Sequence, residues 1–253
     1  MDILQIPILS DNYSYILYDS ITKKTACVDP AEPEPILNEL EKKNFSLDYI
    51  LNTHHHLDHT GGNLKIKKQT GCKIFGPELE KSKIPCIDFG LREGNTYTLG
   101  SLKYKVIETP GHTSGHICLY FFEDNVLFSG DTLFSMGCGR IFEGTYLQMW
   151  ESLKKLRNLP NKTDVYCGHE YTKSNIKFAT HIDPKNLMLK KKQEKVLSLR
   201  TNNQPTVPFK LYDEKIMNPF LRADDEKFKQ MLNVSNKNSV QVFAEIRKQK
   251  DDF

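Results

Sequence analysis

The sequence predicts a layered α/β domain with mixed sheets, followed by a helical region. In the first two-thirds of the 253 residues, short β-rich apolar runs end at turn residues, which is typical of strands. Helical patterns lie between these runs, and one tight polar turn joins two of them, so antiparallel and parallel strand pairs are both expected. After about residue 170 the strand pattern almost disappears. We therefore expect two domains, residues 1–170 and residues 171–253.

Nine apolar runs are predicted to be strands. The two runs on either side of Glu123-Asp124-Asn125 are predicted to form a hairpin, because a short polar turn separates them. In chain order, the predicted strands are Ile3–Ile8, Tyr13–Tyr18, Thr25–Val28, Leu47–Leu51, Cys72–Phe75, Leu102–Ile107, Ile117–Phe122, Val126–Phe128 and Asp164–Cys167.

Apolar residues at helical spacing predict the helices. One helix follows Pro33 and Pro35, and another covers Tyr146–Leu159 with Trp150 on its apolar face. Apolar faces of this kind are expected to pack in the core. In the second region the predicted helices are Thr172–Thr180, Pro184–Arg200, Asp224–Leu232 and Ser239–Lys250, with loops at Asn202–Pro208 and Asn218-Pro219.

Composition excludes several classes of protein. With 38% hydrophobic and 26% charged residues, the chain is too apolar to be disordered and too charged to be a membrane protein. No apolar run approaches the roughly 20 residues of a membrane-spanning helix, and Met1–Gln5 lacks the basic region of a signal peptide. We therefore expect a cytoplasmic protein without a membrane partner. Six scattered cysteines favour free thiols over a disulfide framework.

The net charge of +3 is unevenly distributed. Residues 1–169 carry 18 Lys and Arg against 21 Asp and Glu, whereas residues 170–253 carry 17 against 11. A basic second half could attract an anionic ligand or a nucleic acid, although solvated lysines on helix faces are the simpler interpretation. Lys190-Lys191-Lys192 is a single short run without interleaved aromatic residues. Nucleic acid is therefore not expected as a partner.

A histidine-rich segment directly after a predicted strand points to a metal site. Four of the eight histidines lie in the run Thr53-His54-His55-His56-Leu57-Asp58-His59. In an extended segment His54 and His56 point to the same side, and Asp58 and His59 follow where the chain turns. Imidazole and carboxylate groups suit a divalent metal such as zinc, and also iron or manganese.

Further metal ligands are expected at other strand ends, because a catalytic zinc commonly takes three protein ligands. His112, Asp131 and His169 each come after an apolar run and directly follow a glycine, which suits a tight turn beside a site. Together with the first segment they exceed what one tetrahedral ion accepts, so two metal ions are predicted, with Asp131 as the natural bridge. The predicted ligands are His54, His56, Asp58, His59, His112, Asp131 and His169.

These motifs resemble those of the metallo-β-lactamase superfamily and, more narrowly, of the glyoxalase II (hydroxyacylglutathione hydrolase) family. The superfamily resemblance rests on the His-x-His-x-Asp-His segment with the three later ligands. The narrower resemblance runs to the last residue of the chain. It rests on Gly111–His116, Gly130–Phe134, Gly137–Arg140, Cys167–Tyr171, Gln204–Pro208, Asn218–Phe220 and Arg247–Phe253.

The resemblance implies an αββα sandwich followed by a helical domain that binds the substrate. Residues 1–170 would then be the metal-binding catalytic domain, and residues 171–253 the substrate-binding domain. The resemblance also sorts the ligands: His54, His56 and His112 on one metal ion, Asp58, His59 and His169 on the other, and Asp131 on both. His55 and His116 are not implied as ligands, and we expect them to be structural or to orient a ligand through a hydrogen bond.

The implied activity is hydrolysis of S-D-lactoylglutathione to D-lactate and glutathione, the second step of methylglyoxal detoxification. A hydroxide bound between two metal ions, with Asp58 and Asp131 among their ligands, is the predicted nucleophile, because coordination lowers the pKa of water from about 15.7 to about 7. A thiol pKa near 8.5 lets the thiolate leave without a proton donor. The free carboxylates of glutathione require basic and hydrogen-bonding groups. The implied substrate-binding positions are Arg140, Phe142, Tyr171, Arg247 and Lys250.

Two of these positions depart from the family pattern. Arg140 stands where lysine is common, which keeps the charge and changes the donor geometry. Phe142 stands where tyrosine is common, so one hydroxyl is missing, at a cost of about 0.5–1.5 kcal/mol if it made a net hydrogen bond. We therefore expect weaker glutathione binding with unchanged chemistry.

Other functions fit parts of the sequence. Another hydrolase or oxygenase of the superfamily, such as a lactonase or a persulfide dioxygenase, would keep the metal motif and use a different pocket. A nuclease of this fold is less favoured because the basic residues are mixed with acids. A metal-stabilised binding protein is the alternative from another class, but closed structural zinc sites are rich in cysteine and this motif has none. A monomer is expected, and the metal and the preferred acyl group are left open.

Overall fold

The first half of the chain builds a six-stranded sheet. In this computed structural model, which describes residues 1–253, the strands of that sheet follow one another in chain order. The first three strands pair antiparallel and the later pairs are parallel. They are β1 (Asp2–Ile8), β2 (Asn12–Tyr18), β3 (Thr25–Val28), β4 (Tyr49–Leu51), β5 (Lys73–Pro77) and β6 (Phe89–Leu91).

A second six-stranded sheet has the order β14-β13-β10-β9-β8-β7. The predicted hairpin is present, since β9 and β10 pair antiparallel on either side of the polar turn. β10 and β13 are parallel, and α4 (Tyr146–Arg157) lies between them in the chain. The strands are β7 (Thr96–Leu99), β8 (Leu102–Glu108), β9 (Ile117–Phe121), β10 (Val126–Gly130), β13 (Asp164–Cys167) and β14 (Phe209–Lys210); β11 (Leu133–Phe134) and β12 (Gly137–Cys138) form a separate small hairpin.

Strand alternation separates two apolar layers, as period-two side-chain geometry requires. On β2, Ile16 packs with Ile36 of α1 (Pro33–Lys43) and Ile66 of α3 (Asn63–Thr70) on the outer face of the first sheet. Its neighbours Tyr15 and Leu17 pack in the main core, between the two sheets. The predicted mixed α/β architecture is therefore confirmed as layered sheets covered by helices.

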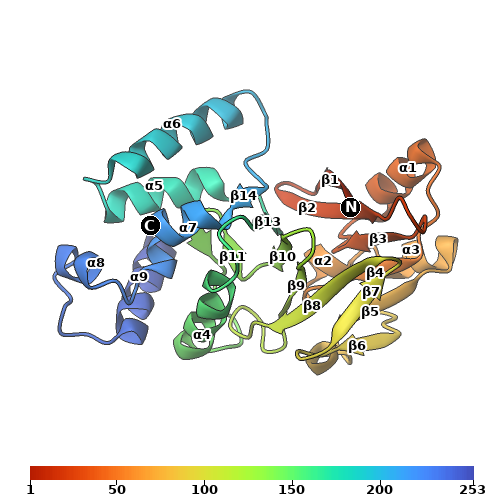
Figure 1. Cartoon of the computed structure of the whole chain (residues 1–253), viewed down its shortest axis with the longest axis horizontal. Coiled ribbons are helices and arrows are strands. Elements are labelled where there is room, and N and C mark those ends of the chain that lie inside the picture. Colours follow the sequence, from red (N-terminus) through yellow and green to blue (C-terminus); the bar gives the residue numbers. More distant parts are fainter.

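The residues after 170 are mainly helical, and their helices gather at the end of the sandwich opposite α1 and α3 (Figure 1). The apolar core continues into this region, because Trp150 of α4 packs against Phe243, with ring centroids 6.0 Å apart. No helix has the length and apolar character needed to cross a membrane. The C-terminal helices are α5 (Thr172–Ile182), α6 (Leu187–Thr201), α7 (Leu211–Met217), α8 (Glu226–Met231) and α9 (Ser239–Asp252).

The sequence patterns missed short or polar elements. The strands β11, β12 and β14 have two residues each, too few for an alternating pattern. Helix α3 buries only two residues, Asn63 and Ile66, so its apolar face is too small to be recognised. Asn218-Pro219, predicted as a loop, begins a 3-10 turn (Pro219–Leu221), in which the Asn218 side chain accepts a hydrogen bond from the Phe220 backbone N–H. These elements depend on tertiary contacts that local patterns do not contain.

Candidate metal centre

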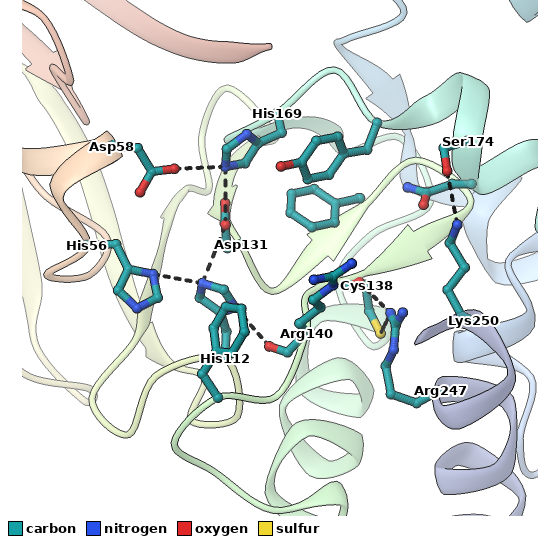
Figure 2. Close-up of a pocket in the computed structure, with 14 residues that line it drawn as sticks. His56, Asp58, His112, Asp131, Cys138, Arg140, His169, Ser174, Arg247 and Lys250 are labelled. Carbon is teal, nitrogen blue, oxygen red and sulfur yellow. Dashed lines mark hydrogen bonds and ion pairs between the residues drawn. The ribbon is translucent and has the colours of Figure 1, made fainter. Parts of the chain in front are cut away.

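The predicted ligands come from four places in the chain that meet at one edge of the sandwich. His54, His56, Asp58 and His59 follow β4, and the last two lie in the one-turn helix α2 (Leu57–Thr60). His112 lies between β8 and β9, Asp131 directly after β10, and His169 two residues beyond the end of β13. Figure 2 shows five of these side chains converging on one pocket. The prediction that strand-end loops bring the seven residues together agrees with this arrangement.

Three imidazoles form the first cluster. His56 Nδ1 lies 3.1 Å from His54 Nε2 and 3.1 Å from His112 Nε2. The ligand atoms of all three rings lie within 4.8 Å of one another, which is close enough for one ion to contact all three. His54 and His112 are buried, and His56 is half-buried.

Asp58, His59 and His169 form the second cluster, and Asp131 lies between the two. His169 Nε2 is 3.4 Å from Asp58 Oδ2 and 3.3 Å from Asp131 Oδ2. The same Asp131 oxygen is 3.4 Å from His112 Nε2 in the first cluster, and the other oxygen is 3.5 Å from His59 Nε2. One carboxylate therefore faces both groups of histidines.

Two buried polar atoms in this centre have no hydrogen-bond partner. His59 Nε2 and Asp131 Oδ1 are both orphaned, although buried polar atoms in proteins are nearly always paired. In the first cluster, ring nitrogens face one another at hydrogen-bond distance. A divalent cation between such atoms would satisfy the orphaned groups and the facing lone pairs. The donor set of imidazoles and carboxylates therefore fits two ions of the zinc, iron or manganese type.

The two clusters differ in their electrostatics. Burial and the neighbouring rings of His59, His116 and His112 hold the pKa of His54 well below its usual range, so this ring is a neutral donor. In the second cluster burial would lower the pKa of His169, but Asp131, Asp58 and Asp11 raise it to about 11. The charge of His169 and His59 lowers the pKa of Asp131 in turn, against the effect of its burial. The second cluster is therefore a set of charged partners in which a cation can replace the protons.

Residues that the motif analysis did not single out hold the ligand rings. Asp29 Oδ2 lies 3.1 Å from His59 Nδ1 and accepts the Thr53 hydroxyl at 2.7 Å, and Asp11 Oδ1 lies 2.9 Å from His169 Nδ1. Such carboxylate–histidine pairs fix the ring orientation of metal ligands. Asp29 follows β3 directly, a strand-end signal of the kind used for Asp131. Asp11, on the three-residue turn between β1 and β2, offered no comparable signal.

His116 has the structural role expected for it. The backbone N–H of Asp131 donates to His116 Nε2 at 3.0 Å, so that nitrogen is an acceptor and the other one carries the proton. His116 Nδ1 then donates toward Thr109 Oγ1, 2.9 Å away. The ring thereby holds the backbone of Asp131 in place. It also stacks on the His54 ring, with centroids 5.0 Å apart, while both of its nitrogens are already hydrogen-bonded.

Close backbone approach explains two of the glycines that precede predicted ligands. A Cβ on Gly168 would lie 2.5 Å from Asp131 Oδ1 and 2.7 Å from a His59 ring carbon. Gly130 has a φ of +47° and lies beside Thr53 and His116. Any other residue at either position would push a ligand away from the centre.

The metal centre opens into a cavity of about 430 Å³ whose opposite wall is cationic. Arg140, Arg247 and Lys250 line that wall across from the clustered ligands (Figure 2). Arg140 is exposed, and Lys250 is half-buried with its Nζ 3.0 Å from Ser174 Oγ. Arg247 is 4% exposed and donates to the Cys138 carbonyl at 3.0 Å and to Asp251 at 2.8 Å.

Two aromatic residues of the predicted set stand at the metal side of the cavity. The Tyr171 ring stacks on His169, with centroids 4.6 Å apart and planes inclined by 7°. The Phe142 ring is 61% exposed and lies 5.1 Å from the His112 ring and 5.9 Å from the His56 ring. The structure thus places all five predicted substrate-facing residues in one pocket with the clusters.

Comparison with known proteins supplies the family. Residues 11–169 match the model of the metallo-beta-lactamase superfamily, and residues 170–253 match that of the hydroxyacylglutathione hydrolase C-terminus. The solved structure of ETHE1 from Myxococcus xanthus, 24% identical, shares the fold, with a TM-score of 0.70 over 98% of this chain and 90% of that one.

Curated relatives carry the same family name along the whole chain. The hydroxyacylglutathione hydrolase of Methylococcus capsulatus is 47% identical over 100% of this chain and 99% of its own length. That of Rhodospirillum rubrum is 49% identical over the same shares. With its two family matches and the paired His and Asp clusters, the chain belongs to the hydroxyacylglutathione hydrolase family of the metallo-beta-lactamase superfamily.

Proposed function

We propose that this protein hydrolyses S-D-lactoylglutathione and related 2-hydroxyacyl thioesters of glutathione, giving D-lactate and glutathione. The observation that carries the proposal is one cavity with two unlike walls: the His and Asp clusters on one side and three cationic side chains on the other. A thioester carbonyl at the clusters would leave the anionic peptide against the cations. The names of the full-length relatives support this substrate class.

The residues of the clusters are proposed to hold two metal ions. His54, His56 and His112 would bind one, Asp58, His59 and His169 the other, and the Asp131 carboxylate both. When bound, such ions activate water at neutral pH and polarise a carbonyl. Zinc is proposed, with iron or manganese as alternatives, because all three accept imidazole and carboxylate donors.

The protein's own groups then orient the substrate. Arg140 and Lys250 provide cationic donors that no carboxylate of the protein neutralises, so they can bind the carboxylates of glutathione. Charge-assisted hydrogen bonds of this kind are among the strongest in proteins. Burial raises the pKa of the Tyr171 hydroxyl, so it remains a neutral donor beside the clusters. Arg247 already binds Cys138 and Asp251, and its Nε–H is buried without a partner. We propose that this N–H group donates to the substrate or that Arg247 holds the cationic side of the cavity in place.

Asp58 is held ready for its proposed role by Asn12. The Asn12 amide donates to Asp58 Oδ2 at 3.0 Å and to the Asp58 carbonyl at 3.1 Å. His169 and His59 lower the pKa of Asp58, against the effect of its burial, so the carboxylate stays ionised. The thiolate of glutathione needs no acid to leave, which suits a pocket whose cations are arginines and a lysine.

The remaining assignments are also proposals. Residues 1–170 would supply the chemistry and residues 171–253 the substrate-binding wall, although Arg140 and Phe142 reach the pocket from the first part. We also propose a role in methylglyoxal detoxification, a cytoplasmic location and a monomeric state.

The test is hydrolysis by the purified, metal-analysed protein. Absorbance of the S-D-lactoylglutathione thioester is followed beside a simple lactone, and oxygen uptake is recorded. We expect rapid loss of the thioester, no oxygen uptake, and loss of activity in His56→Ala. A metal-loaded protein that leaves the thioester intact would overturn the proposal, and turnover of the lactone or oxygen uptake would assign it to another member of the superfamily.

A further inference from the structure

A second set of ionisable side chains lies directly behind the first metal cluster. The ligand-type atoms of His55, Glu80 and Glu143 lie within 4.8 Å of one another. His55 separates two proposed metal ligands in the sequence, yet its side chain contacts this second set. The two carboxylates come from the 3-10 turn Glu78–Glu80 and from the loop between β12 and α4.

Glu80 ties the histidine-rich segment to the turn that follows His112. The carboxylate is completely buried, and its Oε2 accepts both the backbone N–H and the ring Nδ1–H of His55, each at 2.8 Å. Its Oε1 accepts the backbone N–H of Gly115 at 2.8 Å. A Cβ on Gly115 would lie 2.6 Å from Glu80 Cγ, so this contact requires glycine. One side chain therefore fixes the relative position of two ligand-bearing segments.

Glu143 ties the same histidine to the loop that faces the substrate. Its Oε1 lies 3.4 Å from His55 Nε2 and accepts Lys83 Nζ at 2.9 Å. Its Oε2 accepts the backbone N–H of Ser114 at 2.9 Å and the Ser114 hydroxyl at 2.8 Å. The backbone N–H groups of Phe142 and Glu143 both donate to the His112 carbonyl. The loop that carries Arg140 and Phe142 is thereby fastened to the edge of the metal centre.

This set is not arranged as a third metal site. All four carboxylate oxygens already accept hydrogen bonds from protein donors, and Lys83 supplies a cation to Glu143. No polar atom of the three residues is buried without a partner. The metal centre itself shows the opposite pattern, with orphaned atoms at His59 and Asp131.

We propose that Glu80, His55 and Glu143 are positioning residues with divided roles: Glu80 sets the geometry of the His54, His56 and His112 cluster, Glu143 sets the loop that binds the substrate, and His55 joins the two. Partners of this kind change metal affinity by about 10–100-fold when removed. The part that concerns Glu143 rests on the proposed function, whereas the part that concerns Glu80 is read from metal binding alone.

The role proposed for Glu80 is tested by measuring zinc affinity in competition with a chromophoric chelator. Glu80→Gln is expected to bind the weaker of its zinc equivalents about 10–100-fold less tightly than wild type, with KM for the thioester changed less than twofold. Glu78→Gln is the matched control, because Glu78 lies in the same turn and its Oε1 contacts only Arg92, at the surface. Equal zinc affinity in wild type, Glu80→Gln and Glu78→Gln would overturn this role.

The role proposed for Glu143 is tested by measuring KM and metal content in the same variants. Glu143→Ala is expected to keep two zinc equivalents and its kcat while KM rises about threefold to tenfold, and Glu143→Gln, which keeps an acceptor for Ser114, should recover part of the loss. Glu151→Gln, on the exposed face of α4, is the control with unchanged KM. An unchanged KM in Glu143→Ala, or a third zinc equivalent in wild type that this variant loses, would overturn the proposal.

His55→Ala provides a variant that leaves both carboxylates in place. It should show both defects together, weaker zinc binding and a raised KM, because it breaks the connection between Glu80 and Glu143. A defect in only one of them would contradict the joining role of His55. If wild type does not hydrolyse the thioester, the proposed function fails, while the zinc affinities of Glu80→Gln and Glu78→Gln still decide the role of Glu80.

Discussion

The two walls of the pocket are built in different ways. The metal wall consists of strand-end residues whose backbones and rings are fixed by buried partners such as Asp29 and His116. The cationic wall comes from the loop after β12 and from α9. Arg140 there is exposed, and Lys250 donates to Ser174 and lies over the rings of Phe178 and Phe253, but neither side chain is paired with a carboxylate. The metal wall is therefore preorganised, whereas the cationic wall keeps donors free for a ligand.

Under the proposed function, this difference separates the chemistry from the recognition of the substrate. Ligands must be held to within a fraction of an ångström before the substrate arrives, so their partners are numerous and buried. Cations that bind an exchangeable anion must remain hydrated and accessible, so they contribute less per residue. Substitutions in the metal wall should therefore change metal content and kcat, and substitutions in the cationic wall should change KM.

The largest effect is expected from Asp131→Ala, because this carboxylate faces both clusters. We expect loss of at least one of two metal equivalents and a fall in thioester hydrolysis greater than the roughly 10–100-fold that removal of an outer partner causes. Metal analysis and steady-state kinetics measure both, with circular dichroism as the check on folding. Full metal content with activity within tenfold of wild type would show that Asp131 is not a shared ligand.

Gly168→Ala tests the same wall through the backbone. The added Cβ would lie 2.5 Å from Asp131 Oδ1, so we expect about 10–100-fold lower activity and weaker metal binding. Gly94→Ala is the control: it has a φ of +92° with no neighbouring atom, so it should lose stability and keep metal. Similar metal affinities in the two variants would contradict the close packing at residue 168.

Stability should depend on pH through Glu214, which is buried behind the β11–β12 hairpin. Glu214 accepts the Met136 backbone N–H at 2.7 Å and the Asn218 amide at 2.9 Å, next to the hairpin that leads to Arg140. Burial raises its pKa from 4.5 to about 7, against the charge of Lys192. The folded state thus holds a proton that the unfolded state loses, so the free energy of unfolding should fall as pH rises from about 4.5 to 7.

The size of this effect follows from the pKa difference, at about 3 kcal/mol for the buried carboxyl above pH 7. Urea unfolding at pH 5 and pH 8 measures it, with Glu214→Gln as the comparison. The variant lacks the titrating group, so its stability should fall less over this interval. Equal falls in wild type and variant would show that Glu214 does not titrate in the folded protein.

Lys250→Ala should change recognition alone. Burial and the neighbouring Arg247 and Arg140 lower the pKa of Lys250, which shows how closely the cations are gathered. We expect KM to rise about tenfold, which corresponds to about 1.4 kcal/mol, with an unchanged kcat and a weaker dependence of KM on salt. Lys248→Ala, on the same helix and outside the pocket, is the control. A fall in kcat or in metal content would contradict the division between the two walls.

Phe142→Tyr should have the smallest effect. The ring is exposed at the mouth of the pocket beside His112, so an added hydroxyl has room to reach a ligand. We expect glutathione thioesters to bind about 0.5–1.5 kcal/mol more tightly, if the hydroxyl makes a net hydrogen bond. Equal KM values for wild type and variant would remove the explanation that the missing hydroxyl weakens binding.

Local patterns predicted nine strands of the two sheets and the residues that gather at the metal centre, but they missed β6, β7 and β14. Short apolar runs bounded by turn residues predicted strands such as β3 and β13 with their observed bounds. The strand-end positions of His112, Asp131 and His169 predicted that they would meet the histidine-rich segment. The signal was strong because a strand fixes where its last residues lie.

The supporting residues could not be predicted in the same way. Glu80 lies in a polar stretch that reads as solvated surface, yet it is completely buried, because two distant segments supply the N–H donors for its carboxylate. Glu214 is similar, with donors from the β11–β12 hairpin almost 80 residues earlier. A buried carboxylate is stable only with such partners, and they come together only in the folded chain.

Metal titration during turnover tests the central claim most directly. Protein freed of metal with a chelator is titrated with zinc while hydrolysis of S-D-lactoylglutathione and bound zinc are measured in the same samples. Two clusters sharing Asp131 predict two zinc equivalents per chain, with full activity reached only at the second. Full activity at one equivalent, or hydrolysis without metal, would contradict the account of a binuclear centre.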